Sequence, residues 1–319
     1  MPAANATPMI CCSAPMQQTK LHLQRAASSD CTVLITGETG TGKELAAEFI
    51  HANSSRRGEA FVCINCAAIP DNLLESELFG HTRGAFTGAD DVQDGLLLSA
   101  NRGTVFLDEI GDMSLASQAK ILRVIEKKEV CRVGGNRVAK LDVRFLAASN
   151  QELEEMASRG AFRKDLFFRL NVARIHLPPL RDRKDDIPML LHHYCADFRC
   201  NSRLPVPEFS EECLQCLLRY DWPGNIRELK NTIEWMLLGE TPDRIDTEHL
   251  PQHLRKLIET TPSLSQSERN LLLSALFSAK WNKSEAAKKL RWSRMTLYRK
   301  IAKYRISEAT QSESPAEDV

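Results

Sequence analysis

GETGTGKE, residues 37–44, is the stretch of sequence that decides the fold. It follows a β-rich run, TVLIT at 32–36, and opens a segment with helical periodicity at 44–53. A glycine-rich turn between a strand and a helix lets successive backbone N–H groups face an anion, and the helix start adds its positive dipole end. A lysine at this position reaches the β- and γ-phosphates of a nucleotide. The stretch predicts a phosphate-binding loop made of Gly37, Glu38, Thr39, Gly40, Thr41, Gly42, Lys43 and Glu44.

Two acidic residues are the next candidates for nucleotide chemistry. Glu44 stands where such loops usually carry Ser or Thr, so one expected magnesium ligand has to come from another residue. The run VFLDE at 105–109 reads as an apolar strand that ends in two acids. Carboxylates at a sheet edge beside a phosphate loop hold Mg²⁺ and orient the attacking water. We therefore predict ATP and Mg²⁺ as cofactors, with Asp108 on the metal and Glu109 on the water; the alternative is an ordinary solvated strand end.

Short β-rich runs alternate with helical patterns through the first 180 residues. Helical stretches at 44–53, 116–127 and 152–158 lie between runs at 32–36, 61–65, 104–107, 143–147 and 174–177. Alternating strands and helices indicate an α/β fold with a parallel sheet covered on both faces. We expect five strands in that sheet.

The strands stop after Pro178-Pro179, and helical patterns at 186–200, 210–219, 225–238 and 247–258 predict a smaller all-α subdomain. The polar segment ETTPSLSQ reads as a linker, and the acidic C-terminal residues read as disordered. The expected order is a disordered tail at 1–15, an α/β nucleotide-binding subdomain at 16–179, a helical lid at 180–258, the linker at 259–266, a helical unit at 267–305 and a disordered tail at 306–319.

The charge of the chain is unevenly distributed. The formal net charge is zero, yet residues 283–305 contain nine Lys or Arg and one acid, Glu285, so they carry about +8 and the rest about −8. A neutral protein can thus present one concentrated basic patch. No apolar run approaches the roughly 20 residues of a membrane span, and the N-terminus lacks a secretory signal pattern. We expect a cytoplasmic protein with no membrane partner.

The basic patch has the pattern of a helix-turn-helix. A short helical pattern, KSEAAKKL at 283–290, is followed by Arg291-Trp292-Ser293 and a second helix at 294–304, for which Ser293 is a good N-cap. Side chains of the second helix could enter a major groove or contact phosphates. The candidate DNA-binding residues are Lys283, Ser293, Arg294, Thr296, Arg299 and Lys300; a basic solvated helix pair is the alternative.

The ten cysteines contain two CxxC spacings, Cys63/Cys66 and Cys213/Cys216, which together could form a four-thiolate zinc site. The first pair lies on an apolar segment that reads as a buried strand, and the second lies in a helical pattern. Free cysteine behaves as a small buried hydrophobe, and this interpretation is preferred to zinc.

Three arginines, Arg163, Arg169 and Arg227, could stabilise the charge of a phosphoryl-transfer transition state. By spacing alone each is more often a surface salt-bridge partner.

These motifs together resemble a known family from about residue 16 to residue 304. The chain is similar to the AAA+ P-loop ATPase domain and C-terminal Fis-type helix-turn-helix of the bacterial sigma-54-dependent activators. The most specific motif is GAFTGA, formed by Gly84, Ala85, Phe86, Thr87, Gly88 and Ala89. In that family it is a surface loop that contacts sigma-54. Its glycines and alanines make a pliable backbone, and Phe86 is a suitable contact anchor; a tight turn with Phe86 in the core is the alternative.

The resemblance implies further roles, residue by residue. Asn65 is similar to the asparagine that restrains the catalytic glutamate, here Glu109, and Asn150 corresponds to the first sensor. Arg163 and Arg169 match arginines that reach into the neighbouring subunit's site, and Arg227 matches the second sensor. Arginines supplied in trans imply a homo-oligomeric ring, and the family forms hexamers. The expected partners are sigma-54 RNA polymerase holoenzyme and enhancer DNA.

The sequence departs from the family pattern in three ways. Thr82 stands before GAFTGA at a position that is often Glu, which could alter how the loop is coupled. Arg291 replaces the usual glycine of the turn, where a positive φ would cost about 1 kcal/mol in a non-glycine residue. No sensory domain precedes the ATPase, so we expect a regulatory protein acting in trans, or else a longer parent protein.

Three functions are compatible with an ATPase joined to a DNA-binding unit: an ATPase that remodels the closed sigma-54 promoter complex, a DNA-binding regulator with a vestigial ATPase, and a DNA motor or loader of the wider AAA+ group. Intact GKE, Asp108-Glu109 and GAFTGA motifs disfavour the second, and the third does not explain GAFTGA. The sequence therefore favours the first.

Overall fold

The computed structural model describes residues 9–86, 89–199, 206–238, 243–260, 272, 275–276, 279, 282–290 and 292–304. The chain divides into two compact units, residues 1–249 and 250–319. The predicted positions Thr87, Gly88 and Arg291 lie outside the described residues, as do 1–8, 261–266 and the acidic tail.

A parallel five-stranded sheet forms the centre of the first unit, in the order β2-β5-β8-β1-β9. Its strands are β1 (Val33–Thr36), β2 (Phe61–Asn65), β5 (Thr104–Asp108), β8 (Arg144–Ser149) and β9 (Ala173–His176). All five predicted strands are confirmed, and so is the α/β fold. Strand β1 lies between β8 and the edge strand β9, so the loop that follows it opens beside the C-terminal end of β8.

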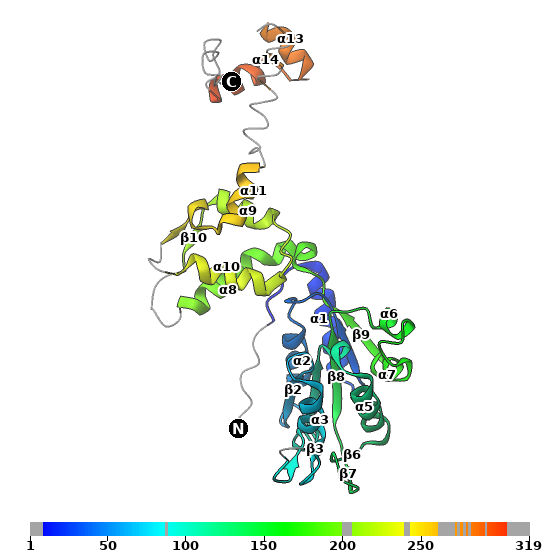
Figure 1. Cartoon of the computed structure of the whole chain (residues 1–319). Coiled ribbons are helices and arrows are strands. Elements are labelled where there is room, and N and C mark those ends of the chain that lie inside the picture. The colour runs from blue at the N-terminus through cyan, green and yellow to red at the C-terminus, as the bar shows by residue number, and fades with distance from the viewer. Residues whose placement is uncertain are drawn as a thin grey trace, which may run out of the picture. The chain divides into compact units, whose positions relative to one another are not determined.

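Helices cover both faces of this sheet (Figure 1). The sheet residues alternate between two apolar clusters, as Val33 and Ile35 face one side and Leu34 the other. One face packs against α1 (Ala14–Ala27) and α2 (Lys43–Ala52). The other packs against α3 (Asp71–Phe79), α4 (Leu96–Ser99), α5 (Leu115–Lys127), α6 (Leu153–Ser158) and α7 (Lys164–Leu170).

Two small antiparallel ribbons extend from this layer. They are formed by β3 (Gly80–His81) with β4 (Gln93–Asp94), and by β6 (Glu129–Cys131) with β7 (Val138–Lys140). A bridge between His81 and Val133 joins the two ribbons. The GAFTGA segment starts three residues after β3.

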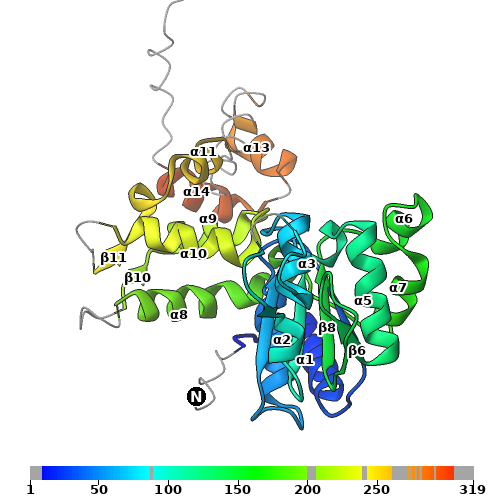
Figure 2. The same cartoon turned by 60° about the horizontal axis from the view of Figure 1, so that its bottom comes forward.

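The lid follows β9 and is helical, as predicted. Helices α8 and α10 lie side by side in both views (Figures 1 and 2). The lid elements are η2 (Leu180–Asp186), α8 (Ile187–Arg199), β10 (Glu208–Phe209), α9 (Glu211–Arg219), α10 (Asn225–Met236), β11 (Arg244–Ile245) and η3 (Thr247–His249).

The second unit contains α11 (Gln252–Thr260), α13 (Lys283–Lys289) and α14 (Arg294–Lys303). Small and aliphatic side chains, among them Leu276, Ala286 and Leu297, form its buried core. Leu290 and Ile301 pack against that core. Helix α11 runs to Thr260, so the segment predicted as a linker begins inside a helix.

The N-terminal prediction needs a correction. A disordered tail through residue 15 does not hold for residues 9–15, because the backbone N–H groups of Cys12 and Ser13 donate to Asp186 Oδ1 at 2.6 and 2.7 Å. The Ser13 hydroxyl donates to Asp186 Oδ2 at 2.8 Å, and α1 begins at the next residue. The segment is therefore anchored to the start of the lid.

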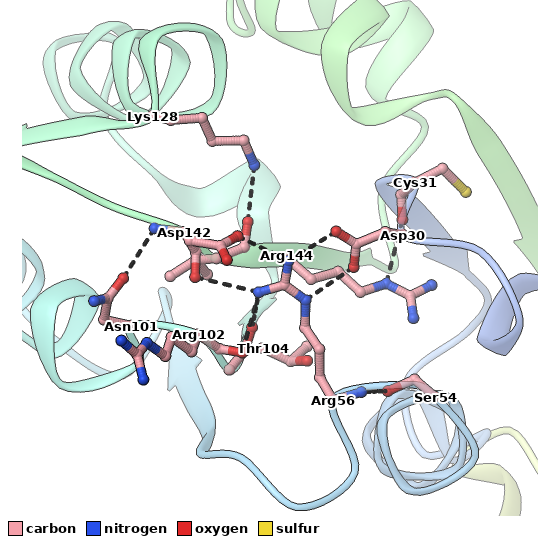
Figure 3. A network of polar contacts seen from close by, with 12 residues as sticks. Asp30, Cys31, Ser54, Arg56, Asn101, Arg102, Thr104, Lys128, Asp142 and Arg144 are labelled. Atoms are coloured by element: carbon pink, nitrogen blue, oxygen red, sulfur yellow. Dashed lines mark hydrogen bonds and ion pairs between the residues drawn. The ribbon is translucent and has the colours of Figure 1, made fainter.

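Arg56 links the N-terminal ends of the strands, at the end of the sheet opposite the phosphate loop (Figure 3). Its guanidinium forms ion pairs with Asp30, before β1, and Asp142, before β8, both at 2.8 Å. It also donates to the carbonyls of Arg102 and Gly103, before β5, at 3.1 and 3.3 Å. The Arg56 side chain, which is only 14% exposed, thus links the segments that precede three neighbouring strands, β5, β8 and β1.

Replacing Arg56 by alanine should destabilise the first unit by about 1–3 kcal/mol, because charge-assisted hydrogen bonds to a mostly buried guanidinium are removed. Arg56 lowers the pKa of Asp142 below its ordinary 3.8. The stabilisation is therefore complete above that pH and is lost as the pH falls through the lowered pKa. Urea unfolding at pH 7 and pH 3 (about one unit below the ordinary aspartate pKa) measures both effects.

Arg159→Ala is the matched control for that experiment. Its ion pair with Glu155 is 75% and 66% exposed, so it should change stability by less than about 0.5 kcal/mol. An Arg56→Ala variant as stable as this control at pH 7 would show that the network contributes nothing.

Candidate functional site

The predicted phosphate-binding loop lies between the C-terminal end of β1 and α2. Gly40 and Gly42 have φ of +79° and +100°, a conformation that glycine adopts at little cost. A β-carbon at Gly40 would lie 2.3 Å from the Gly224 carbonyl oxygen, so the lid backbone approaches the loop too closely for any side chain. The loop is thus shaped by its glycines on one side and by the lid on the other.

Lys43, the first residue of α2, is buried and points back over the loop. Its Nζ donates to Gly37 O at 3.1 Å and lies 3.1 Å from Glu109 Oε1. The ammonium group therefore lies between the loop backbone and the end of β5. Such a position suits a cation that binds nucleotide phosphates.

The Glu109 carboxylate is held by two groups, Lys43 at the start of α2 and Asn150 after β8. Glu109 follows β5 in the left-handed conformation, with φ of +50°, which is uncommon for a residue other than glycine and often found at functional sites. Its Oε2 accepts from the Asn150 backbone N–H at 2.9 Å, and the Asn150 Nδ2 donates to Thr39 Oγ1 at 3.0 Å. The predicted first sensor thus bridges the glutamate and the phosphate loop.

The environment of Asp108 shows whether this residue could bind a divalent cation. Its Oδ1 is buried and has no hydrogen-bond partner among the residues that the structure describes. Burial and the neighbouring Glu109 raise the pKa of Asp108. An unpaired carboxylate oxygen beside a phosphate loop fits Mg²⁺, which uses one or two carboxylates together with phosphates and water.

Asn65 lies at the end of β2, in register with Asp108. Its Oδ1 accepts from the backbone N–H groups of Ala67 and Ala68 at 3.0 and 3.1 Å. The structure therefore places Asn65 beside the acidic pair, with its carboxamide oxygen bonded to its own turn rather than to Glu109.

A cleft lies between the predicted phosphate-binding loop and the lid. Thr39, Lys43, Asp108 and Glu109 line it from the α/β layer, and Arg227 lines it from α10. His193 and Tyr194 of α8 also line the cleft, and no sequence pattern had indicated them. Both lie in an ordinary amphipathic helix, so the sequence carried no separate signal for them.

Glu38 has a different role from the other loop residues. Its carboxylate receives two hydrogen bonds from Arg181, at 2.9 and 2.6 Å, and one from Asn225 at 3.1 Å. These contacts lower the pKa of Glu38 to about 2. Its carboxylate therefore binds the lid, and Arg181 and Asn225 are site residues that the sequence motifs did not identify.

Arg163 and Arg169 lie away from this cleft, on α7 and its N-cap. The Arg163 guanidinium pairs with Asp165 at 2.7 Å, and Arg169 pairs with Glu126 at 2.9 Å. Both side chains are exposed, and neither lines the cleft in the described part of the chain.

The described part of the GAFTGA segment is a turn that leaves Phe86 accessible. Gly84 N–H donates to Ala89 O at 2.8 Å, which closes the turn. Phe86 is 40% exposed and packs edge-on against His81, with ring centroids 5.1 Å apart. Thr82 N–H donates to Val133 O at 3.1 Å, so the turn is tied to the loop between β6 and β7. The alternative of Phe86 inside the core is therefore wrong.

The second helix of the helix-turn-helix has a capped start and an exposed face. Ser293 caps α14 by accepting from Thr296 N at 3.1 Å, and the two hydroxyls also bond, so both residues stabilise the helix start. Arg294 and Arg299 are exposed. The side chains of Met295 and Tyr298, not predicted, are 80% and 51% exposed on the same helix.

Lys283 and Lys300 each lie over an aromatic ring. Lys283 Nζ is 5.2 Å from the centre of Tyr298, and Lys300 Nζ is 5.0 Å from the centre of Trp292. Both predicted DNA-binding lysines thus also stabilise the helix pair through cation–π contacts.

The nine described cysteines do not form a metal-binding cluster. No group of three or more His, Cys, Asp or Glu side chains within the described ranges is arranged to hold a metal ion. Cys66, Cys213 and Cys216 are buried, whereas Cys63 is exposed because β2 is an edge strand. The prediction that Cys63 lies in a buried strand is wrong. In the same described ranges, no helix is long and apolar enough to cross a bilayer.

Comparison with known proteins gives the same assignment for most of the chain, from residue 9 to residue 304. Residues 9–176 match the sigma-54 interaction domain, 181–267 the AAA+ ATPase lid domain, and 263–304 the Fis family of bacterial regulatory proteins. Transcriptional regulatory protein ZraR of Salmonella typhimurium is 44% identical over 95% of this chain and 70% of its own length. DNA-binding transcriptional regulator NtrC of Proteus hauseri is 39% identical over 92% and 69%.

A solved structure of NtrX from Brucella abortus in complex with ATP has a TM-score of 0.74 and 30% identity, over 94% of this chain and 70% of that one. The fold and the cleft define the class: an AAA+ nucleotide-binding module with a helical lid and a Fis-type DNA-binding unit. Within that class, the chain belongs to the sigma-54-dependent transcriptional activators.

Proposed function

We propose that this protein hydrolyses ATP, with Mg²⁺, and uses the energy to remodel the closed sigma-54 RNA polymerase complex into an open one at promoters near its enhancer DNA. The observation that carries the proposal is the grouping of Lys43, Glu109 and Asn150 at one edge of the sheet, linked by contacts of 2.9 to 3.1 Å. The NtrX structure in complex with ATP supports the nucleotide assignment.

Each group in the cleft has one task. Lys43 and the loop N–H groups bind the β- and γ-phosphates. Asp108 would hold Mg²⁺, which would neutralise charge that develops on the phosphates. Glu109 orients the attacking water and accepts its proton. Asn150 fixes Glu109 against the loop, and Arg227 contacts the γ-phosphate from the lid. Asn65, which lies in register with Asp108 on the neighbouring strand, would restrain Glu109.

We also propose that the active form is a homo-oligomeric ring, with six subunits as in the family. Arg163, the N-cap of α7, and Arg169 on α7 are exposed and do not line their own subunit's cleft, so they suit residues that reach into a neighbouring subunit's site. Regulation would come from a partner protein or from a longer parent chain. An activator of RNA polymerase would work in the cytoplasm.

Energy transfer can be separated from ATP hydrolysis by a Phe86→Ala variant. Phe86 is exposed on the GAFTGA turn and remote from the phosphate loop, so the variant should hydrolyse ATP at the wild-type rate, within about twofold. It should reduce sigma-54 open-complex formation at least about tenfold, since aromatic anchors dominate such contacts. Permanganate footprinting of promoter DNA, alongside phosphate release, measures both quantities.

Leu21→Ala, on α1, removes a comparably exposed apolar side chain and should affect neither quantity. Normal open-complex formation by Phe86→Ala would show that the turn does not contact sigma-54. Thr87→Ala, which shortens the other side chain of the motif that is larger than a methyl group, should give the same two results as Phe86→Ala.

The helix-turn-helix serves as the DNA anchor. Replacing Arg294 and Arg299 by alanine should weaken enhancer binding and reduce the dependence of affinity on salt, by about one unit of slope for each phosphate that the protein no longer neutralises. Electrophoretic mobility shifts between 50 and 200 mM salt (about the usual working range) would measure this. Binding that is unchanged in both affinity and slope would place the DNA contact on another surface.

A further inference from the structure

Asn225 is fully buried at the first turn of α10, and its carboxamide contacts residues on both sides of the cleft. Its Nδ2 donates to Glu38 Oε2 and to Thr39 O, both at 3.1 Å, on the phosphate loop. Its Oδ1 accepts from the backbone N–H of Leu180, the first lid residue, at 2.7 Å. One amide thus uses both donor hydrogens and its oxygen to join loop and lid.

The neighbouring backbone strengthens this connection. Ile226 N–H donates to Gly40 O at 3.0 Å, and the Gly40 backbone is in close approach to Gly224. On the outside, Arg181 forms its two hydrogen bonds to the same Glu38 carboxylate. The apex of the phosphate loop is therefore bonded to the lid through the Glu38 carboxylate and the carbonyls of the two residues that follow it.

The turn that carries Asn225 is itself fixed from the lid side. Trp222 and Asn225 have φ of +52° and +53°, a conformation that asparagine tolerates better than most residues. The Glu228 carboxylate accepts from Gly224 N–H at 2.8 Å and from the Tyr220 hydroxyl at 3.0 Å. A shift of the loop apex must therefore move the start of α10 rather than bend the turn.

We propose that Asn225 is a positioning residue that couples the phosphate loop to Arg227, two residues further along α10, so that the lid responds to the nucleotide through the loop backbone. The proposal rests on the proposed nucleotide function of the cleft. Asn225 touches neither phosphate nor water in this role; it sets where Arg227 lies with respect to Lys43 and Thr39, which line the same cleft.

The proposal can be tested by exchanging the amide of Asn225 with the carboxylate of Glu38. Asn225→Asp places a second carboxylate against Glu38 and the Thr39 carbonyl, and should weaken binding of a fluorescent ADP derivative, mant-ADP, about 10- to 100-fold. Adding Glu38→Gln returns the pair to one negative charge and lets the glutamine amide donate to the introduced aspartate. The double variant should bind about tenfold more tightly than Asn225→Asp.

A double-mutant cycle tests whether Asn225 acts through Arg227. The effects of Asn225→Gly and Arg227→Ala on mant-ADP affinity and on kcat and KM for ATP should be clearly less than additive in the double variant. Glycine keeps the positive φ, so this variant removes the amide without straining the turn. Asn53→Asp, at the exposed C-terminal end of α2, is the matched control and should bind mant-ADP as the wild type does.

Rescue by Glu38→Gln together with the non-additive cycle is the expected result. Absence of rescue, additive effects, or wild-type binding by Asn225→Asp would each overturn the proposal. Affinity for mant-ADP requires no hydrolysis, so a wild-type protein that binds it but does not cleave ATP would contradict the proposed function alone.

Discussion

A Lys43→Ala variant should lose nucleotide binding, with an affinity for ATP at least about 100-fold below that of the wild type and no measurable hydrolysis. Lys43 is 6% exposed, and its ammonium already lies among the loop carbonyls and Glu109. In the complex it would face two phosphate groups in a partly desolvated cleft, where one charge pair has a large effect. Isothermal titration with ATP and Mg²⁺ measures the loss.

Lys120→Ala is a suitable control for that titration. Lys120, on α5, forms an ion pair with Glu75 of α3, and the Lys120 side chain is 45% exposed. Removing this side chain should therefore leave ATP affinity within about twofold of the wild type. Wild-type affinity in Lys43→Ala would show that the loop does not bind phosphates in the way the geometry indicates.

Replacing Glu109 by glutamine should separate binding from hydrolysis. The amide oxygen can still accept from Asn150 N–H, so the local structure and ATP affinity should be retained. Removing the negative charge also frees Lys43 from its 3.1 Å ion pair, so affinity should equal or exceed that of the wild type. A glutamine cannot accept a proton from water, and hydrolysis should fall about 10²- to 10⁴-fold.

Single-turnover ATP cleavage measures that loss directly. Glu155→Gln, which alters an exposed ion pair on α6, should cleave at the wild-type rate. Rapid cleavage by Glu109→Gln would require another group to activate the water, and Asp108 would then be the first residue to examine.

The sheet could be predicted from the sequence because buried parallel strands are dense apolar runs that local patterns reveal. Helix α1 escaped prediction because its buried face, which includes Thr19 and Ala26 beside Leu23, is weakly apolar. Helices α3, α4 and α7 were also missed, since they have only nine, four and seven residues and their burial depends on the sheet. Short helices gain most of their stability from tertiary packing.

The candidate site divides in the same way. The loop, the two acids and the exposed Phe86 could be predicted because each is a local motif with its own chemistry. Glu38 was assigned to the nucleotide, but its carboxylate binds Arg181 and Asn225, which are 143 and 187 residues away in sequence. No local pattern reports such a pairing. The helical pattern at 225–238 indicated only that a helix starts at Asn225, not which residue Asn225 would contact.

The central claim about this protein is that it uses the energy of ATP hydrolysis to open the sigma-54 promoter complex. In vitro transcription with purified protein, enhancer-bearing template and either sigma-54 holoenzyme or the major sigma factor's holoenzyme tests it most directly. We predict transcripts only with sigma-54 holoenzyme, only with hydrolysable ATP, and none with Glu109→Gln. Equal activation of both holoenzymes, or activation by sigma-54 holoenzyme without hydrolysis, would contradict the claim.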